Sequence, residues 1–404
     1  METPHVVFLL TGLLVLAIVL QPLARRLHIP LSALLVIAGF LVSEFMVLAG
    51  MDTGVRAGNF HDLVFFVFLP ILIFESAYNI DVRLLFRNLL PVLFLAIPLM
   101  LLSALITAAL VYAGIAHPGG FPWIAALLTG ALLSATDPVA VVALFREMGV
   151  SDRLGLLLEG ESLFNDATAI VLFGVFLAVA TGSGGPMTWT DAAWHFSRVF
   201  FGGILAGGVT GFIMAAVMKL LRDPVTRAVA TVITAYLAFA IAESQLHVSG
   251  VMAVLVAGLV LGRDRENESF VQELWEFNAW IANALVFLLM GVTITLDMFT
   301  ERWLAMLIGV AGVIIARAIG IFTCIPLLPG VLPVEAIPRS YQVIMFWGGL
   351  RGAVTLALAL SLPTTLDYWW TIQSIAFGVV LFTLFIQATT TGPLIRHYNL
   401  NKSS

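Results

Sequence analysis

Apolar stretches long enough to cross a lipid bilayer recur along the whole chain, and they constrain the fold more than any other feature. A transmembrane helix needs about 20 predominantly apolar residues. Of the 404 residues, 61% are hydrophobic and 11% are charged, whereas about 25% are charged in an ordinary soluble domain. A water-soluble surface cannot be built from this composition. The sequence therefore predicts an all-α polytopic membrane protein that lies almost entirely in the bilayer.

Polar and Pro/Gly-rich interruptions divide the chain into about thirteen expected spans. The first apolar run has no preceding Lys or Arg and no cleavage site before Arg25, so we expect a retained helix and not a signal peptide. Twelve spans are the alternative, because the eighth and ninth are short. The expected spans cover residues 5–22, 30–50, 61–80, 88–114, 121–146, 154–180, 195–220, 226–243, 247–262, 272–296, 302–324, 338–361 and 369–392.

Lys and Arg residues gather on one side of this thirteen-span arrangement, which predicts its orientation. The loops after odd-numbered spans and the C-terminal tail hold fourteen of them, and the opposite side holds only Arg56, Arg198 and Arg302. We therefore expect the N-terminus outside and the C-terminus in the cytoplasm. The fourteen are Arg25, Arg26, Arg83, Arg87, Arg146, Arg153, Lys219, Arg222, Arg227, Arg263, Arg265, Arg339, Arg396 and Lys402.

With thirteen spans, the first and the eighth start on opposite sides of the membrane. This is the arrangement of two inverted six-helix repeats, a plan common among transporters. Spans one to six and eight to thirteen then have opposite orientations, with the seventh as connector. The fifth span is interrupted at Thr136-Asp137-Pro138, and the twelfth, its equivalent, at residues 348–352. The sequence therefore predicts crossed discontinuous helices near the middle of the bilayer.

Charged side chains inside the spans are candidate functional residues, because each costs about 2.5 kcal/mol or more to insert. Four carboxylates and two guanidiniums leave anionic capacity for a cation or a proton. Asp166 lies about 18 Å along its helix from the cytoplasmic end, close to the midplane. The six residues are Glu75, Asp137, Glu161, Asp166, Arg317 and Arg351.

Neutral polar groups near Asp166 complete the candidate site. Ser162, Asn165 and Asp166 share one helix face, and Pro138 frees carbonyls near Thr136 from their usual helical partners. A hydrogen-bonded patch between helices and a plain proline kink are the structural alternatives.

The remaining buried charges receive structural or access roles. Arg317 and Arg351 do not readily deprotonate, so we interpret them as counter-ions. Glu161 is the expected partner of one of them, with Arg317 favoured and Arg351 left open. Glu75 is a ligand, an access-path acid or an interfacial glutamate. The single cysteine, Cys324, excludes an intramolecular disulfide and a thiolate cluster.

Two motifs carry a family resemblance: residues 134–140 (SATDPVA) and residues 160–166 (GESLFND). In this order and spacing they resemble the NhaP type of prokaryotic sodium/proton antiporter, within the monovalent cation:proton antiporter 1 family. Residues 74–77 and 348–353 look like two further family segments.

The resemblance implies a single transmembrane unit over residues 1–404, in the plasma membrane of a prokaryote (the inner membrane), surrounded by lipid. It implies a homodimer with a core bundle at about 88–180 and 302–392 and a dimerisation part at about 5–80 and 195–296. No cofactor and no nucleic-acid partner are expected, because the substrates are ions.

The resemblance also implies site roles and a transport mode. Asp166, Ser162, Thr136 and Glu75 would bind sodium, with Asp137 acting through water and Asn165 orienting the site. Electrogenic relatives have Asp at the position of Asn165, which implies electroneutral one-to-one exchange. The expected function is secondary active exchange of sodium, or of lithium, for protons by alternating access. A potassium/proton antiporter and a cation channel are the alternatives; an enzyme is not expected, because no histidine lies at midplane depth.

Overall fold

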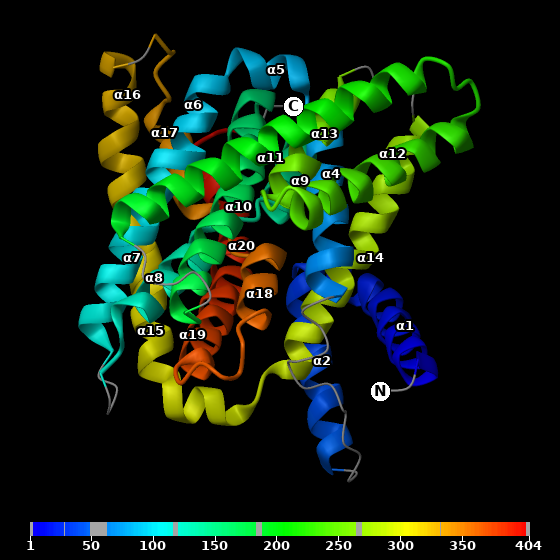
Figure 1. Ribbon diagram of the computed structural model, residues 1–404. Coiled ribbons are helices and arrows are strands. Elements are labelled where there is room, and N and C mark those ends of the chain that lie inside the picture. Colours follow the sequence, from blue (N-terminus) through cyan, green and yellow to red (C-terminus); the bar gives the residue numbers. More distant parts are fainter. Residues whose placement is uncertain are drawn as a thin grey trace.

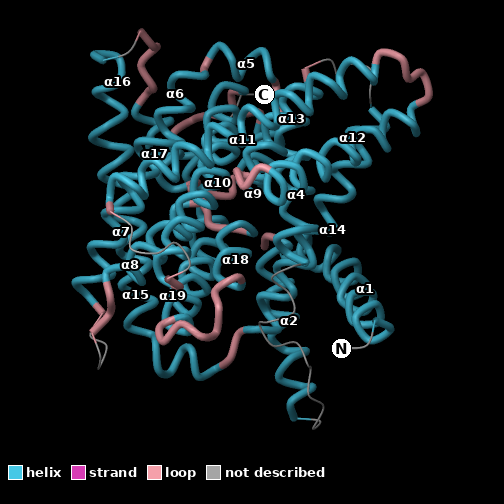
Figure 2. The backbone as a smooth tube through the Cα atoms, viewed as in Figure 1, coloured by secondary structure: helices cyan, strands magenta, loops and turns pink. Residues whose placement is uncertain are grey.

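Helices form all the regular secondary structure in the part of the chain that the structure describes. The computed structural model describes residues 3–27, 29–48, 63–115, 120–182, 188–263, 269–331 and 333–400. Figures 1 and 2 show a bundle of helices joined mostly by short loops, with no strand among these residues. The all-α prediction is confirmed for these residues.

The elements follow the expected spans closely, with ends that differ by several residues. In chain order they are α1 (Thr3–Leu27), α2 (Leu31–Leu48), η1 (Val64–Phe68), α4 (Leu69–Asn79), α5 (Val82–Arg87), α6 (Leu89–Phe94), η2 (Leu95–Leu99), α7 (Met100–Gly114), α8 (Trp123–Ser134), α9 (Val139–Met148), α10 (Asp152–Ala180), α11 (Trp189–Met218), α12 (Pro224–Ala240), η3 (Ile241–Gln245), α13 (Gly250–Gly262), α14 (Ser269–Thr293), α15 (Leu296–Ile319), η5 (Gly320–Cys324), α16 (Ile325–Val331), α17 (Arg339–Trp347), α18 (Ala353–Leu360), α19 (Trp369–Phe382), η6 (Thr383–Gln387) and α20 (Ala388–His397).

Thirteen membrane-spanning stretches can be assigned within the described ranges. Eight are apolar stretches of 22 to 35 residues, and four are shorter apolar helices at Thr11–Ala24, Leu31–Met46, Val64–Asn79 and Gly250–Gly262. The interrupted pair α17 and α18 is the thirteenth. The count of thirteen is therefore confirmed over the alternative of twelve.

Two spans are interrupted at the positions that the sequence predicts, and the two interruptions touch. The fifth span breaks between α8 and α9, and the twelfth breaks between α17 and α18. The Asp137 amide donates a hydrogen bond to the Leu350 carbonyl across the crossing (2.8 Å). A Cβ atom at Gly352 would overlap the Asp137 carboxylate, so only glycine permits this approach. The prediction of crossed discontinuous helices is confirmed.

Small residues bring other spans into close contact. At the crossing of α2 and α14, a Cβ atom added to Gly291 would overlap the Val36 carbonyl and lie 2.8 Å from the Phe40 amide nitrogen. Gly39 on α2 faces the same crossing, where its added Cβ would lie 3.1 Å from the Gly291 Cα atom. Close backbone packing of this kind replaces the hydrophobic driving force that is missing between helices in lipid.

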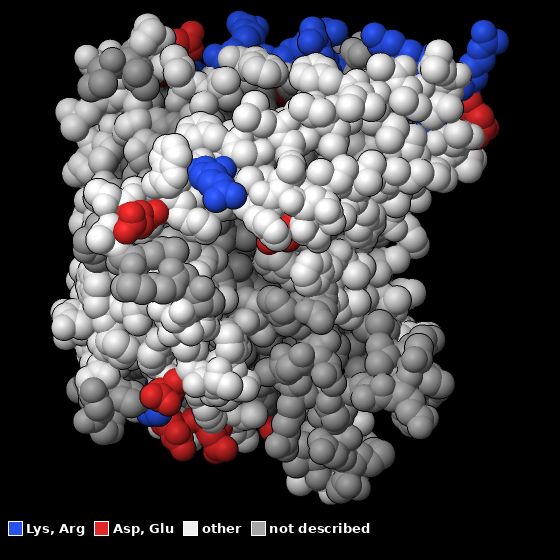
Figure 3. Space-filling model, in the orientation of Figure 1, with Lys and Arg blue, Asp and Glu red and all other residues white. Residues whose placement is uncertain are grey.

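Charge is distributed unequally between the two ends of the bundle. Figure 3 shows most of the visible Lys and Arg side chains gathered at one end, and a group of acidic side chains at the other. Arg56, Arg265 and Lys402 from the loop count lie outside the described residues.

Replacement of Gly291 by alanine tests the α2–α14 crossing. We expect Gly291→Ala to lower stability by about 1–3 kcal/mol, because the new methyl group meets backbone atoms that must shift. Thermal unfolding of purified protein in detergent, followed by intrinsic fluorescence, measures the change. Gly174→Ala is the matched control, since open space surrounds Gly174 on α10; equal melting temperatures for the two variants would contradict the expectation.

Candidate ion site

At the break in the fifth span, each of the two helix ends contacts a charged side chain. One side chain is positive and the other is negative. The Arg351 guanidinium donates from Nη1 to the carbonyls of Ser134 and Ala135, each at 2.9 Å. These carbonyls lie at the C-terminal end of α8, where the helix dipole is negative. At the N-terminal end of α9, the Val139 amide donates to the Asp137 carboxylate (3.1 Å). Each half-helix end therefore faces a side chain of opposite charge.

The broken end of α17 is held in the same manner by the other buried arginine. Arg317 donates from Nε and Nη2 to the Met345 carbonyl at 3.3 and 2.9 Å. The same guanidinium forms an ion pair with Glu161 through both carboxylate oxygens. Both side chains are buried. Of the two partners that the sequence left open, the structure places Arg317, and not Arg351, against Glu161.

Thr136 lies in the break and forms three hydrogen bonds with side chains of α10. The Ser162 hydroxyl donates to the Thr136 carbonyl. The Asn165 amide nitrogen donates to the Thr136 hydroxyl at 2.7 Å, and its oxygen accepts from the Thr136 backbone amide at 3.3 Å. A side-chain amide suits this arrangement because it offers a donor and an acceptor together.

Asp166 follows Asn165 on α10 and borders the same break. One of its carboxylate oxygens, Oδ1, is buried, and no hydrogen-bond partner for it is found among the described residues. A buried carboxylate oxygen without a protein partner is a candidate ligand for a cation or a water molecule. The geometry thus provides a carboxylate oxygen with open coordination capacity, next to the residues that hold Thr136.

Glu75 is the candidate that the structure leaves apart from this group. It is half-buried on α4 and accepts hydrogen bonds from Asn79 (2.9 Å) and Ser76 (3.4 Å) of its own helix. No hydrogen bond between Glu75 and Asp166 is found in the described part of the chain. The carboxylates of Glu159 and Glu276 are close enough to act electrostatically on Glu75.

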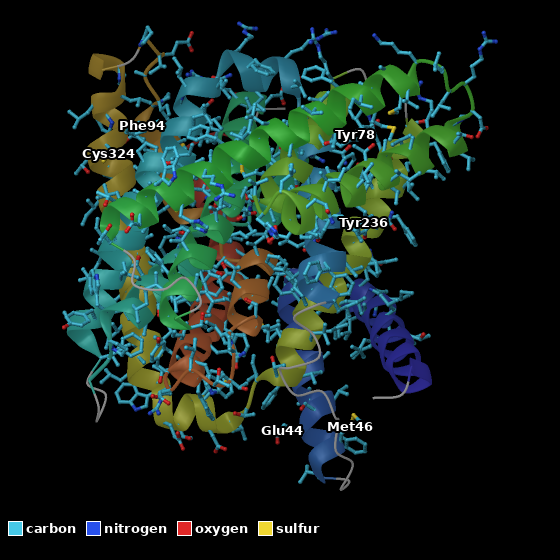
Figure 4. The ribbon with its side chains drawn as sticks, in the orientation of Figure 1. Glu44, Met46, Tyr78, Phe94, Tyr236 and Cys324 are labelled. Carbon is cyan, nitrogen blue, oxygen red and sulfur yellow. The ribbon has the colours of Figure 1, made fainter. Side chains whose placement is uncertain are left out.

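Two threonines that sequence analysis did not single out also contact the breaks. The Thr355 hydroxyl donates to the Ala135 carbonyl (3.4 Å), and the Thr383 hydroxyl contacts the backbone of Arg351. A threonine in an apolar helix is ordinary, so only a search for polar residues at equivalent depth could have drawn attention to them. Cys324, by contrast, lies at the edge of the bundle (Figure 4).

The chain is similar to known proteins of one family over nearly its whole length. Residues 12–397 match a family described as "Sodium/hydrogen exchanger, transmembrane". The Na(+)/H(+) antiporter ApNhaP of Aphanothece halophytica is 37% identical over 92% of this chain and 70% of its own length. The low-affinity Na(+)/H(+) antiporter NhaS1 of Synechocystis is 35% identical over 94% of this chain and 71% of its own length.

A solved structure has the same fold. The sodium proton antiporter MjNhaP1 from Methanocaldococcus jannaschii superimposes with a TM-score of 0.83, covering 98% of both chains at 22% identity. That level of identity supports the fold alone. The family match, in contrast, extends over nearly the whole sequence and includes both interrupted spans. This chain is therefore a member of the sodium/hydrogen exchanger family.

Proposed function

We propose that this protein is a secondary active antiporter that exchanges sodium for protons by alternating access. The observation that carries the proposal is the buried Asp166 oxygen without a partner, beside the unwound backbone at Thr136. The relatives ApNhaP and NhaS1 are sodium/proton antiporters. A midplane site between broken helices is typical of secondary transporters.

Coupling follows from competition for one carboxylate. An ionised carboxylate in a site of low dielectric is costly, and either a proton or a bound cation removes that cost. The Asp166 carboxylate therefore carries one or the other, but not both. If the empty charged site does not cross between the two access states, each crossing carries a sodium ion or a proton, and a gradient of one drives the other.

The neighbouring groups complete the proposed sodium site. Asp166, the Ser162 hydroxyl and the Thr136 carbonyl are the proposed ligands. The Ser162 oxygen and the Thr136 carbonyl oxygen each retain a lone pair for a cation while they remain hydrogen-bonded to each other. Asn165 orients Thr136, and Asp137 acts through water. Glu75, which lies apart from these groups and accepts hydrogen bonds from Asn79 and Ser76 of its own helix, is proposed as the acid on the access path.

The moving and fixed parts are proposed from the way the helices pack. Within the proposed core, at about 88–180 and 302–392, α7 packs against α8 and α15, and α15 packs against α19. Within the proposed dimerisation part, at about 5–80 and 195–296, α2 packs against α14 and α11 packs against α13. We propose that the first group moves against the second, which forms a homodimer in the prokaryotic inner membrane.

The proposed orientation has the N-terminus outside and the C-terminus in the cytoplasm. The gathering of Lys and Arg at one end of the bundle supports it (Figure 3), because positive charge is retained on the cytoplasmic side during insertion.

Removal of the Asp166 charge tests the site. We expect Asp166→Asn to abolish exchange in proteoliposomes, because an amide neither takes up nor releases the proton and supplies no negative charge to balance the cation. Asp137→Asn should only reduce it, since Asp137 holds the α9 end and acts through water. Fluorescence dequenching of a pH-sensitive dye after addition of sodium, lithium or potassium measures transport and cation preference together.

Asp367→Asn is the control for this experiment, because Asp367 is exposed in the loop before α19 and should leave exchange unchanged. Full activity in Asp166→Asn would eliminate the proposed site. Sodium flux that a pH gradient could not drive uphill would indicate a channel, and the antiport proposal would be wrong.

The response to membrane potential tests the stoichiometry. Asn165 leaves one titrating aspartate at this position of α10, so we expect one proton per sodium and no net charge movement. Initial exchange rates measured with a potassium gradient and valinomycin should be equal at zero and at imposed potential. A voltage-sensitive dye in the same vesicles verifies that the potential exists. A rate that rises under one polarity and falls under the other would refute electroneutral exchange.

A further inference from the structure

The Thr383 hydroxyl on the last span contacts the backbone of the interrupted twelfth span. Thr383 is buried, with 1% of its surface exposed. Its Oγ1 atom accepts a hydrogen bond from the Arg351 amide (3.2 Å) and lies 3.3 Å from the Arg351 carbonyl oxygen. Arg351 belongs to the unwound stretch between α17 and α18, where no helix supplies partners for these two backbone groups. The Thr383 hydroxyl therefore contacts the two backbone groups of Arg351 that would bond to other residues in a continuous helix.

The local geometry of the last span brings Thr383 to this position. Thr383 is the first residue of η6, a five-residue stretch with wider π-helical turns between α19 and α20. Such insertions in α-helices occur frequently at functional sites. The Thr383 hydroxyl also lies 2.9 Å from the Val380 carbonyl of its own helix. Because a hydroxyl has a single proton, it can donate to Val380 or to Arg351, while it accepts from the Arg351 amide.

A short series of contacts joins Thr383 to the candidate ion site. The backbone that Thr383 holds belongs to Arg351, whose guanidinium binds the carbonyls of Ser134 and Ala135. The next residue is Thr136, whose carbonyl accepts from Ser162. Two residues, Arg351 and Ala135, thus lie between Thr383 and the proposed sodium ligand Thr136. Thr383 itself is not a proposed ligand.

We propose that Thr383 is a positioning residue for cation binding: its hydroxyl fixes the backbone of Arg351, and through the Arg351 guanidinium it fixes the unwound segment that presents the Thr136 carbonyl. The proposal rests on the proposed sodium/proton exchange. Small displacements of a carbonyl ligand change cation affinity more than they change helix packing, because coordination distances are narrowly defined. Loss of the hydroxyl should therefore affect sodium binding more than the maximal rate.

Thr383→Val removes the hydroxyl while it retains the shape of the side chain. In proteoliposomes we expect the apparent KM for sodium to rise about fivefold to tenfold, as for the loss of one well-placed buried hydrogen-bonding group. The rate at saturating sodium should change less than twofold. Because protons then compete more effectively with sodium, the pH of half-maximal exchange should also move upward. Thr383→Ser, which retains the hydroxyl, should restore both values to within twofold of the original protein.

Thr391→Val is the matched control. Thr391 is also buried on the last span, and among the described residues its hydroxyl donates only to the Gln387 carbonyl of its own helix (2.7 Å). Removal of this hydroxyl should leave the KM for sodium unchanged. Equal effects of Thr383→Val and Thr391→Val would reduce Thr383 to an ordinary helix residue and overturn the proposal.

Two further outcomes keep this test separate from that of the proposed function. If Asp166→Asn abolishes exchange while Thr383→Val has the original KM, only the role of Thr383 is wrong. If Asp166→Asn retains exchange, the proposed site itself fails. Thr383→Ala provides a second hydroxyl-free variant. If neither it nor Thr383→Val elutes as a single species on size-exclusion chromatography, Thr383 is required for folding and the positioning role is refuted.

Discussion

The contact between the two interrupted spans is the constraint on which the site depends. Unwinding two helices at one depth of a bilayer exposes backbone donors and acceptors that lipid cannot satisfy. The structure meets this cost in pairs: the Asp137 amide bonds to the Leu350 carbonyl, and Arg351 bonds to two carbonyls at the end of α8. Protein groups alone thus hold the unwound stretch around Thr136 in place.

Buried charge serves two different purposes in this arrangement. Arg317, Arg351 and Glu161 are occupied by helix ends and by each other, and their role is to hold backbone in place. Asp166 alone among the buried acids of the site has a carboxylate oxygen without a partner in the described part of the chain. These contacts hold the backbone in place, and the spare Asp166 oxygen is the proposed site for the cation and the proton. A buried ion pair is therefore a matter of specificity here more than of net stability.

Much of this could be predicted from the sequence, because the relevant signals are local. Apolar length defines the spans, Pro138 and the glycines at 348–352 mark the breaks, and an aspartate at midplane depth is rare enough to single out Asp166. The partner of Glu161 could only be favoured, since Arg317 is 156 residues away and its approach depends on tertiary packing. The role of Thr383 could not be predicted at all, because it depends on a π-helical turn that has no clear sequence signature.

The bond between Asp137 and Leu350 joins backbone to backbone. Substitution of either side chain leaves both its donor and its acceptor in place, except for proline at position 137, which would remove the amide hydrogen. Residues that line the proposed ion site can therefore change without loss of this backbone hydrogen bond. The same backbone framework is therefore compatible with different ion selectivities, set by the side chains that line the proposed site.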